Sequence, residues 1–357
     1  MNNSIDNFHK LTICSFDIRL MQSANYKKKI DELINFIQSS NIDIICLQGV
    51  HDTRLLKFII KKILLLNIDQ HNPFFHTFPT IDTSQLYQDT DNTLNNRNDV
   101  LKITWSKSND QDLSNIDCLI ISKFRIISCG KEEMRWDNIT ENRFVYVTNI
   151  NFNGTLLSIY NAGFLNDFIG ISNSPIRRYQ IKQLKKIINA NTENIKRDKH
   201  IYKMAINENI NIITCLANIT EILNNDINPE YLYFIRTLKC IDVYRYVQTI
   251  KQKYSNNKKD ATTLCGLRMN YILLHCDDDN LNENLDNTTG NIACKIENIV
   301  YKNNKLIIVN STINKMLVYY DDYPIISSFL VEKKSNVQED NKSSSGDEED
   351  IAIEIDD

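Results

Sequence analysis

Oxygen-bearing side chains stand at or near the ends of several predicted strands, where they could serve as ligands of a cation. They are Asp17, Asn161, Asn207, Asn209, Asn270, Asp321 and Asp322. Carboxylate and carboxamide oxygens are the ligands that Mg²⁺ and Ca²⁺ prefer. General acid–base catalysis most often uses a histidine, and the six histidines stand at other positions, 9, 51, 71, 76, 200 and 275. His51, just beyond a predicted strand, is interpreted as a loop histidine.

The elements that must position these residues are short apolar runs typical of strands. Their alternating or continuous apolar patterns demand burial against a second layer. The predicted sheet strands are Leu11–Ile18, Ile42–Gln48, Cys118–Ser122, Thr155–Asn161, Ile201–Ile206, Arg268–His275 and Ile325–Val331. Helices are predicted over Tyr26–Gln38, Ile176–Asn189 and Asn218–Asn225, and Asn153-Gly154 predicts a hairpin turn. Hairpins mixed with helices predict packed sheets flanked by helices.

Composition limits the class of protein. The 357 residues are 42% hydrophobic and 24% charged, which is enough apolar material for a core. Residues 333–357 hold three Lys and nine Asp or Glu, a net charge of -6. Since the whole chain has a net charge of -4, the remainder sums to +2. This nearly neutral charge does not support nucleic acid as a partner.

The sequence has no feature that predicts a membrane or secreted protein. It contains no apolar run of about 18 residues and no apolar signal core, so neither a transmembrane segment nor a signal peptide is expected. The nine Cys are scattered and form no C-x-x-C pair, which is typical of reduced thiols and argues against zinc. We therefore expect a cytoplasmic or nuclear protein.

The chain is predicted to form one main domain. Residues 1–8 are a short polar N-terminal segment, and residues 9–332 are the domain, with polar insertions at about 82–115 and 277–291. Residues 333–357, which we call the acidic tail, lack aromatic residues and carry like charges. The acidic tail is therefore predicted to be disordered and dispensable for folding.

Nine segments, in order along the chain, match the motifs of one family. Asp43–Val50 is similar to D-I-I-x-L-Q-E-V, Cys118–Ile126 to L-A-I-L-S-K-x-P-I, and Arg268–Leu273 to R-I-D-Y-I-L. The other six segments are Leu11–Ile18, Gly154–Phe164, Arg177–Gln180, Ile206–Asn209, Ile241–Arg245 and Asp321–Ile325. The chain therefore resembles the endonuclease/exonuclease/phosphatase superfamily, the Mg²⁺-dependent phosphoric-ester hydrolases related to DNase I. The resemblance implies an α+β fold, a four-layer α/β/β/α sandwich of two mixed sheets with helices on both outer faces, whose loops at one edge build a single site.

The resemblance also implies a site whose residues are mostly replaced in this chain. Gly49 stands in place of a metal-binding Glu, and Gly163 in place of an acid–base His. By position, the family's catalytic residues correspond to Asn207, Asn209, Asn270, Asp321 and Asp322, its metal site to Asp17, and a phosphate-binding residue to Asn161. Only Asn209 and Asp321 keep the family's residue type.

Three hypotheses remain open. In the first, the protein has lost hydrolytic activity and acts as a binding or scaffolding protein, with a protein or a phosphate-containing ligand as its partner. In the second, it is an active divalent-metal-dependent phosphodiesterase or phosphatase with a rebuilt site, acting on nucleic acid, a phospholipid or an inositol phosphate. In the third, the fold is a different α/β fold. No cofactor is expected, unless Asp17, Asn209, Asp321 and Asp322 form a residual Mg²⁺ site.

Overall fold

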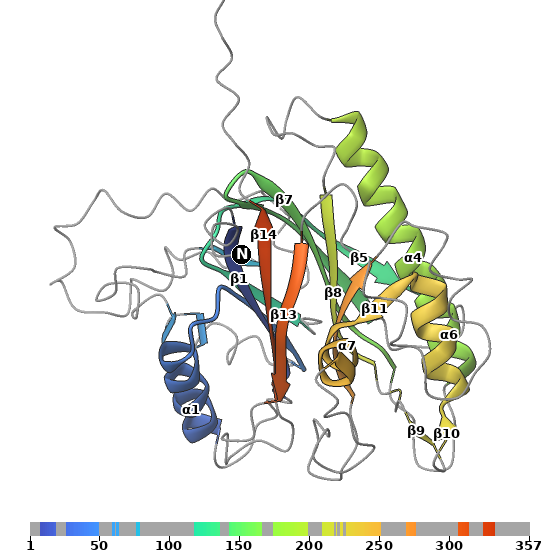
Figure 1. The fold of residues 1–357 in the computed structure, drawn as a ribbon, viewed down its shortest axis with the longest axis horizontal. Helices are drawn as coiled ribbons and strands as arrows, with labels where there is room; N and C mark the ends of the chain where they lie inside the picture. Colours follow the sequence, from blue (N-terminus) through green and yellow to red (C-terminus); the bar gives the residue numbers. More distant parts are fainter. Residues whose placement is uncertain are drawn as a thin grey trace, which may run out of the picture.

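Two six-stranded sheets form the centre of the protein (Figure 1). The computed structural model describes residues 8–18, 26–49, 59–60, 62–63, 76–78, 118–135, 143–165, 174–198, 209–217, 219, 222–223, 226–250, 269–275, 306–313 and 324–332. Sheet 1 has the strand order β13 (Leu306–Ile313), β14 (Ile325–Glu332), β1 (Phe8–Asp17), β2 (Ile44–Gln48), β4 (Cys118–Ser122), β3 (His76–Phe78). Sheet 2 has the order β11 (Cys240–Asp242), β12 (Asn270–His275), β8 (Asn209–Leu216), β7 (Thr155–Gly163), β6 (Arg143–Phe152), β5 (Ile126–Met134).

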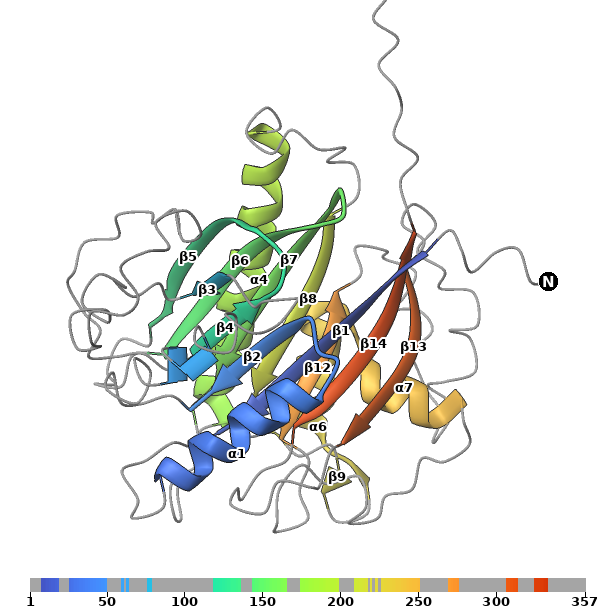
Figure 2. The same cartoon turned by 90° about the vertical axis from the view of Figure 1, so that its left-hand side faces the viewer.

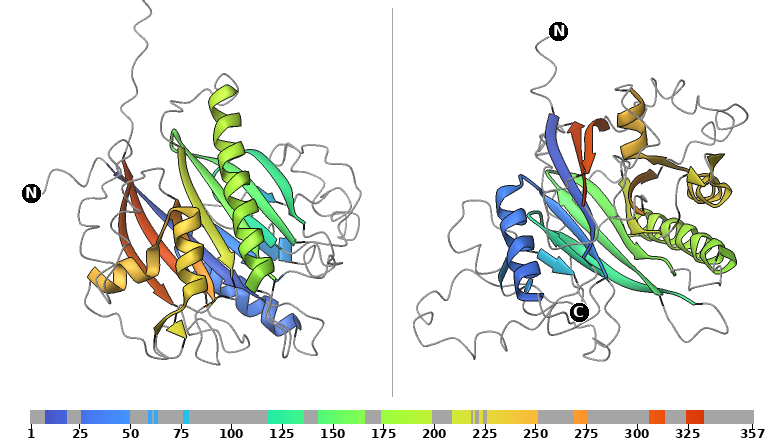
Figure 3. Two further views of the ribbon diagram at one scale, coloured as in Figure 1. Left: turned by 90° about the vertical axis from the view of Figure 1, so that its right-hand side faces the viewer. Right: turned by 90° about the horizontal axis from the view of Figure 1, so that it is seen from below.

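Helices cover the outer faces of both sheets. Helix α1 (Tyr26–Ser39) lies on sheet 1, as Figure 2 shows. Helices α4 (Ser174–Arg197) and α6 (Pro229–Leu238) lie side by side on sheet 2 (Figure 3). The shorter α7 (Val243–Ile250) packs against β12 and β13, and β9 (Ile222–Leu223) pairs with β10 (Asp226–Ile227). The expected four-layer α/β/β/α sandwich is confirmed.

The alternation of side chains along the strands produces three apolar layers. In β1, Leu11 and Ile13 pack between the sheets, whereas Cys14 and Phe16 pack on the α1 side. Each sheet contains one parallel strand pair, β1 with β2 and β7 with β8, while its other pairs are antiparallel. Because both faces of the central strands are covered, apolar side chains fill most of their positions, which gives the largely apolar runs seen in the sequence.

The turn between β6 and β7 is the predicted Asn153-Gly154 hairpin. Both residues have a positive φ, 49° for Asn153 and 89° for Gly154. A two-residue type I′ turn requires this conformation at both positions, and Asn followed by Gly adopts it most readily. The backbone N–H of Gly154 also donates a 2.9 Å hydrogen bond to the Asn151 side chain. The hairpin prediction is therefore confirmed.

Most of the predicted elements are present, with shifted ends. Six of the seven predicted strands lie in the two sheets, and the seventh, Ile201–Ile206, falls outside the described residues. The predicted helix Ile176–Asn189 is longer, from Ser174 to Arg197. The helix predicted over Asn218–Asn225 is wrong at Ile222–Leu223, which form a strand. No helix in the described part of the chain is long and apolar enough to span a bilayer.

Candidate functional site

Several strand ends meet at one end of the sandwich, which we call the site end. In sheet 1, Asp17 at the end of β1 pairs with Gln48 at the end of β2. In sheet 2, Gly163 at the end of β7 pairs with Leu216 at the end of β8, and Leu216 also pairs with Asn270 at the start of β12. The site end is therefore built from residues far apart in the sequence.

A hydrogen bond between two buried carboxamides joins the two sheets at the site end. Gln48 Nε2 donates to Asn161 Oδ1 over 2.7 Å, and Asn161 Nδ2 donates to the backbone oxygens of Leu47 (3.0 Å) and Leu119 (3.3 Å). Both side chains are fully buried. Asn161 of sheet 2 thereby bonds to two strands of sheet 1, so its carboxamide fixes how the sheets meet.

Thr214 of β8 extends this polar contact toward a thiol. Its hydroxyl donates to Asn161 Oδ1 over 3.3 Å and also hydrogen-bonds with Cys46. Burial raises the pKa of the Cys46 thiol to about 12, although the bond with Thr214 partly lowers it. The thiol is therefore neutral at physiological pH and does not act as a thiolate nucleophile.

Two glycines occupy the positions where the family resemblance implies a metal ligand and an acid–base group. Gly49 follows β2 directly and has a φ of 71°, in the left-handed region that favours glycine. Gly163 ends β7, and a Cβ atom added there would meet no described atom within 4 Å. A Cβ atom at 163 therefore meets no steric obstacle among the described residues, whereas one at 49 would strain the backbone.

The predicted site residues divide into three groups: those at the site end, those outside the described residues, and Asn209, which lies elsewhere. Asp17, Asn161 and Asn270 are buried at the site end. Asn207, Asp321 and Asp322 lie outside the described residues, as does His51.

Asn209 is placed elsewhere, and its expected position is corrected. It begins β8 and pairs with Leu156, at the end of the strand opposite to Gly163. Its Oδ1 lies 3.0 Å from Ser158 Oγ, and its Nδ2 donates to Asn211 over 3.0 Å. Asn209 therefore belongs to a hydrogen-bonded network between α4 and sheet 2. The cause of the error is the strand position, because the chain enters β8 at Asn209 instead of leaving a strand there.

The residues that follow β8 lie near the site end, although the sequence pattern did not predict them there. Ala217 is buried directly after the strand, and its N–H donates to the Met269 oxygen over 3.0 Å. Asn218 comes next but lies outside the described residues. The signal that could have located them is the apolar run from Ile210 to Leu216, which has the length and β-branched content of a buried strand.

The R-x-x-Q motif on α4 holds the chain just beyond Gly163. Arg177 is buried and forms two 2.8 Å bonds to the Glu230 carboxylate on α6, and its Nη1 donates to the Leu165 oxygen over 3.3 Å. The Gln180 carboxamide oxygen accepts a 3.1 Å hydrogen bond from the Leu165 N–H. Both polar groups of the Leu165 backbone are thus bonded to one helix, which fixes the path of the chain as it leaves the site end.

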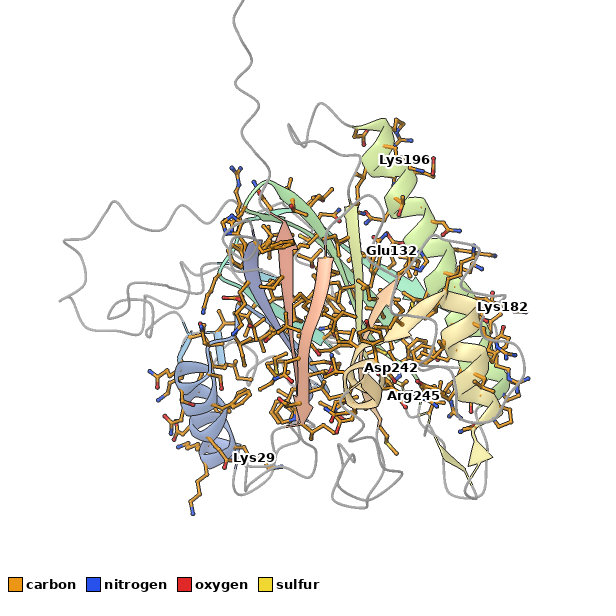
Figure 4. All side chains as sticks on the ribbon, viewed as in Figure 1. Lys29, Glu132, Lys182, Lys196, Asp242 and Arg245 are labelled. Carbon is orange, nitrogen blue, oxygen red and sulfur yellow. The ribbon has the colours of Figure 1, made fainter. Side chains whose placement is uncertain are left out.

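The D-V-Y-R segment also has a structural role. Asp242, labelled with Arg245 in Figure 4, accepts a 2.8 Å hydrogen bond from the Tyr231 hydroxyl. Its second carboxylate oxygen accepts from the Arg245 N–H over 3.2 Å, in the first turn of α7. The carboxylate therefore caps α7 and ties it to α6.

The described part of the site end does not fit a divalent cation. Asp17 provides one carboxylate, and the Asn161 oxygen already accepts hydrogen bonds from Gln48 and Thr214. A cation would have to displace both donors to bind that oxygen. Among the described residues, no three His, Cys, Asp or Glu side chains gather as a metal site would require.

No protein-family model and no curated protein sequence matches the chain. Solved structures do match. The human nocturnin catalytic domain with bound sulfate has a TM-score of 0.52 and 13% identity, over 90% of this chain and 94% of that domain. Truncated TDP2 from Caenorhabditis elegans has a TM-score of 0.51 and 11% identity, over 90% and 97%. An endonuclease/exonuclease/phosphatase family protein from Leptotrichia buccalis has a TM-score of 0.50 and 12% identity, over 89% and 99%.

These likenesses define the architecture as the two-sheet sandwich shared by those proteins. The chain has the DNase I-like fold of the endonuclease/exonuclease/phosphatase superfamily. At 11–13% identity the likeness is one of fold, and the chemistry has to be argued from the site itself.

Proposed function

We propose that this protein has lost hydrolytic activity and acts as a binding or scaffolding protein on a DNase I-like fold. The observation that carries the proposal is the pair of glycines at the site end, Gly49 and Gly163. Neither has a side chain that could coordinate a metal or transfer a proton. Acid–base assistance typically contributes about 10²–10⁴-fold in rate, and a metal ion several kcal/mol of charge stabilisation. Without both, hydrolysis is expected to fall close to the uncatalysed rate.

The bonding of the remaining polar groups supports the same proposal. The Gln48 and Asn161 carboxamides are buried, and they bond to each other and to backbone oxygens. Groups that act on a substrate must exchange these bonds for bonds to the ligand. Here the bonds join the two sheets, so they contribute to the stability of the sandwich.

A rebuilt active site is the second candidate function. Two observations favour it: Asp17 is a buried carboxylate at the end of β1, and the Gln48 side-chain oxygen has no hydrogen-bond partner among the described residues. Asp321 and Asp322 could add carboxylates from the segment before β14. Such a set of oxygens would suit Mg²⁺ or Mn²⁺ and a phosphodiester or phosphomonoester substrate.

One assay separates the two functions. The purified full chain is incubated with Mg²⁺ or Mn²⁺ and bis-p-nitrophenyl phosphate, and separately with DNA and RNA, and turnover is compared with buffer. We expect background rates. Metal-dependent turnover that Asp321→Ala abolishes would establish the rebuilt site. The matched control is Asp31→Ala, which removes an exposed carboxylate on α1.

The binding role needs its own readout. Bis-p-nitrophenyl phosphate and inorganic phosphate are titrated against the full chain while its thermal midpoint is followed. A ligand that binds only the folded state raises the midpoint, so a rise without turnover supports a phosphate-binding role. An unchanged midpoint at millimolar ligand would exclude that role and leave a protein partner as the remaining form of the proposal.

A further inference from the structure

The outward face of α4 is basic over more than two turns. Arg178, Lys182 and Lys186 are exposed and follow one another at four-residue spacing, and Lys185 is partly exposed beside them. We call these four residues the basic face. Successive members of the four-residue series are separated by about 6 Å along the helix axis.

No carboxylate in the described structure neutralises the basic face. The ion pairs on α4 involve other residues, namely Arg177, Lys196 and Arg197. Among the described residues the four side chains of the basic face have no acidic partner, and Arg178 instead lies over the Tyr233 ring at 5.3 Å. Because the chain outside the acidic tail has a net charge of only +2, this face is a local excess of positive charge.

The opposite side of the molecule provides an internal comparison. Helix α1 also begins with consecutive lysines, Lys27 to Lys29, but Asp31 and Glu32 follow within one turn. Helix α4 has no Asp or Glu before Glu193. Lys29 and Lys182, which mark the two helices, lie on opposite sides in Figure 4. A partner that is attracted by positive charge should therefore select α4 over α1.

We propose that the acidic tail of this chain docks on the basic face of α4. The tail carries nine acidic residues, and four of them are consecutive, from Asp347 to Asp350. This run matches the four positive charges of the basic face. Ile351, Ile353 and Ile355 follow the acidic run, and Tyr179, which is 39% exposed, offers an aromatic surface beside the basic face.

The position of the last strand makes this contact reachable. Strand β14 ends at Glu332, which pairs with Phe8 at the end of the sandwich opposite to the site end. The last turn of α4 lies at the same end of the molecule (Figure 1). The 15 residues from Glu332 to Asp347 span at most about 50 Å, and α4 is about 36 Å long. The tether also holds the acidic run at a local concentration on the order of millimolar.

The test uses the full chain and a zero-length carbodiimide cross-linker, which joins a carboxylate to a lysine amine. The cross-linked positions are identified by mass spectrometry. At low salt we expect cross-links from Asp347–Asp350 to Lys182, Lys185 and Lys186, at about tenfold the yield to Lys27–Lys29, since several weak ion pairs act together. In 1 M NaCl, where the Debye length is about 3 Å, this preference should disappear.

Two charge-reversal variants provide the matched comparison. Lys182→Glu with Lys186→Glu should reduce cross-linking of the tail to Lys185 by about tenfold. Lys27→Glu with Lys28→Glu on α1 should leave it unchanged. Equal yields on α1 and α4, or a yield on α4 that does not depend on salt, would overturn the proposal.

A separate nucleic acid is the competing occupant, and a second measurement distinguishes it. A labelled single-stranded oligonucleotide is titrated against the full chain and against the Lys182→Glu, Lys186→Glu variant. If the tail occupies the basic face, the full chain binds the oligonucleotide weakly. Tight, salt-dependent binding that the variant loses, together with no cross-links from the tail, would assign the face to a nucleic acid and overturn the proposal.

Discussion

Replacing Arg177 with methionine should severely destabilise the protein. The change removes both 2.8 Å bonds to Glu230 and the bond to the Leu165 oxygen. It leaves the Glu230 carboxylate, whose side chain is only 11% exposed, without its cation. Breaking a buried pair in this way costs about 3–5 kcal/mol. That loss is a large part of the roughly 5–15 kcal/mol by which most domains are stable.

The assay is urea unfolding followed by circular dichroism, with Arg178→Met as the control. Arg178 is the neighbouring residue but is exposed and lies over Tyr233, so its replacement should change the free energy of unfolding by no more than about 1 kcal/mol. Replacing both Arg177 and Glu230 with methionine should recover most of the lost stability, because no buried charge is then left without a partner. A loss below about 1 kcal/mol for Arg177→Met alone would refute the reasoning.

Two further predictions concern the site end. Gly163→Ala should leave the free energy of unfolding unchanged or slightly raised, because a Cβ atom there meets no described atom within 4 Å, whereas Gly49→Ala, at a φ of 71°, should lower it by about 1–2 kcal/mol. Equal effects at both glycines in denaturant titrations would contradict this difference. Since burial raises the pKa of Cys46 from about 9 to about 12, its share of stability is present below pH 9. That share is lost as the pH rises toward 12, because only the unfolded thiol ionises in this range. The stability difference between the wild type and Cys46→Ala should therefore decrease from pH 9 to pH 11, and a constant difference would contradict the assignment.

The sequence predicted the strands well because burial on both faces leaves a strong apolar signal. Cys118–Ser122 was predicted to the residue, and Ile325–Val331 to within one. Side chains alternate between the two faces of a strand, so Asp17 and Asn161, near the ends of β1 and β7, point between the two sheets. The predictable part of the site is therefore the part that follows from strand position alone.

The predicted position of Asn209 was wrong because a short match to a family motif was preferred over the longer apolar run that follows it. The segment Ile206–Asn209 resembles a family motif, so Asn209 was expected to follow a strand. The apolar run from Ile210 to Leu216 was the stronger signal, and it places Asn209 at the start of β8. Contacts between distant residues could not be predicted either. Gln48 and Asn161 are 113 residues apart, and only the packing of the two sheets joins them.

The basic face was hidden from composition because net charge averages over the whole surface. Residues outside the acidic tail sum to +2, which predicts a neutral surface. Helical periodicity concentrates Arg178, Lys182 and Lys186 on one side of α4, whereas the buried side of the same helix carries Arg177 and Gln180 near its start and is apolar from Ile181 onward. Charge distribution is a property of the fold, which total charge does not report.

Polar bonds at two heights along α4 determine its position along its own axis. Near its start, Arg177 bonds to Glu230. Fourteen residues later, Asn191 Nδ2 lies within hydrogen-bond distance of Asn149 Oδ1, Ser158 Oγ and the Tyr160 hydroxyl, which share its two N–H groups. These points are about 21 Å apart. An apolar helix face repeats at each turn and would tolerate a slip of about 5.4 Å, but such a slip would break both sets of bonds. Helix α4 is therefore held in one register against sheet 2. A ligand bound to α4 would consequently have a fixed position relative to that sheet.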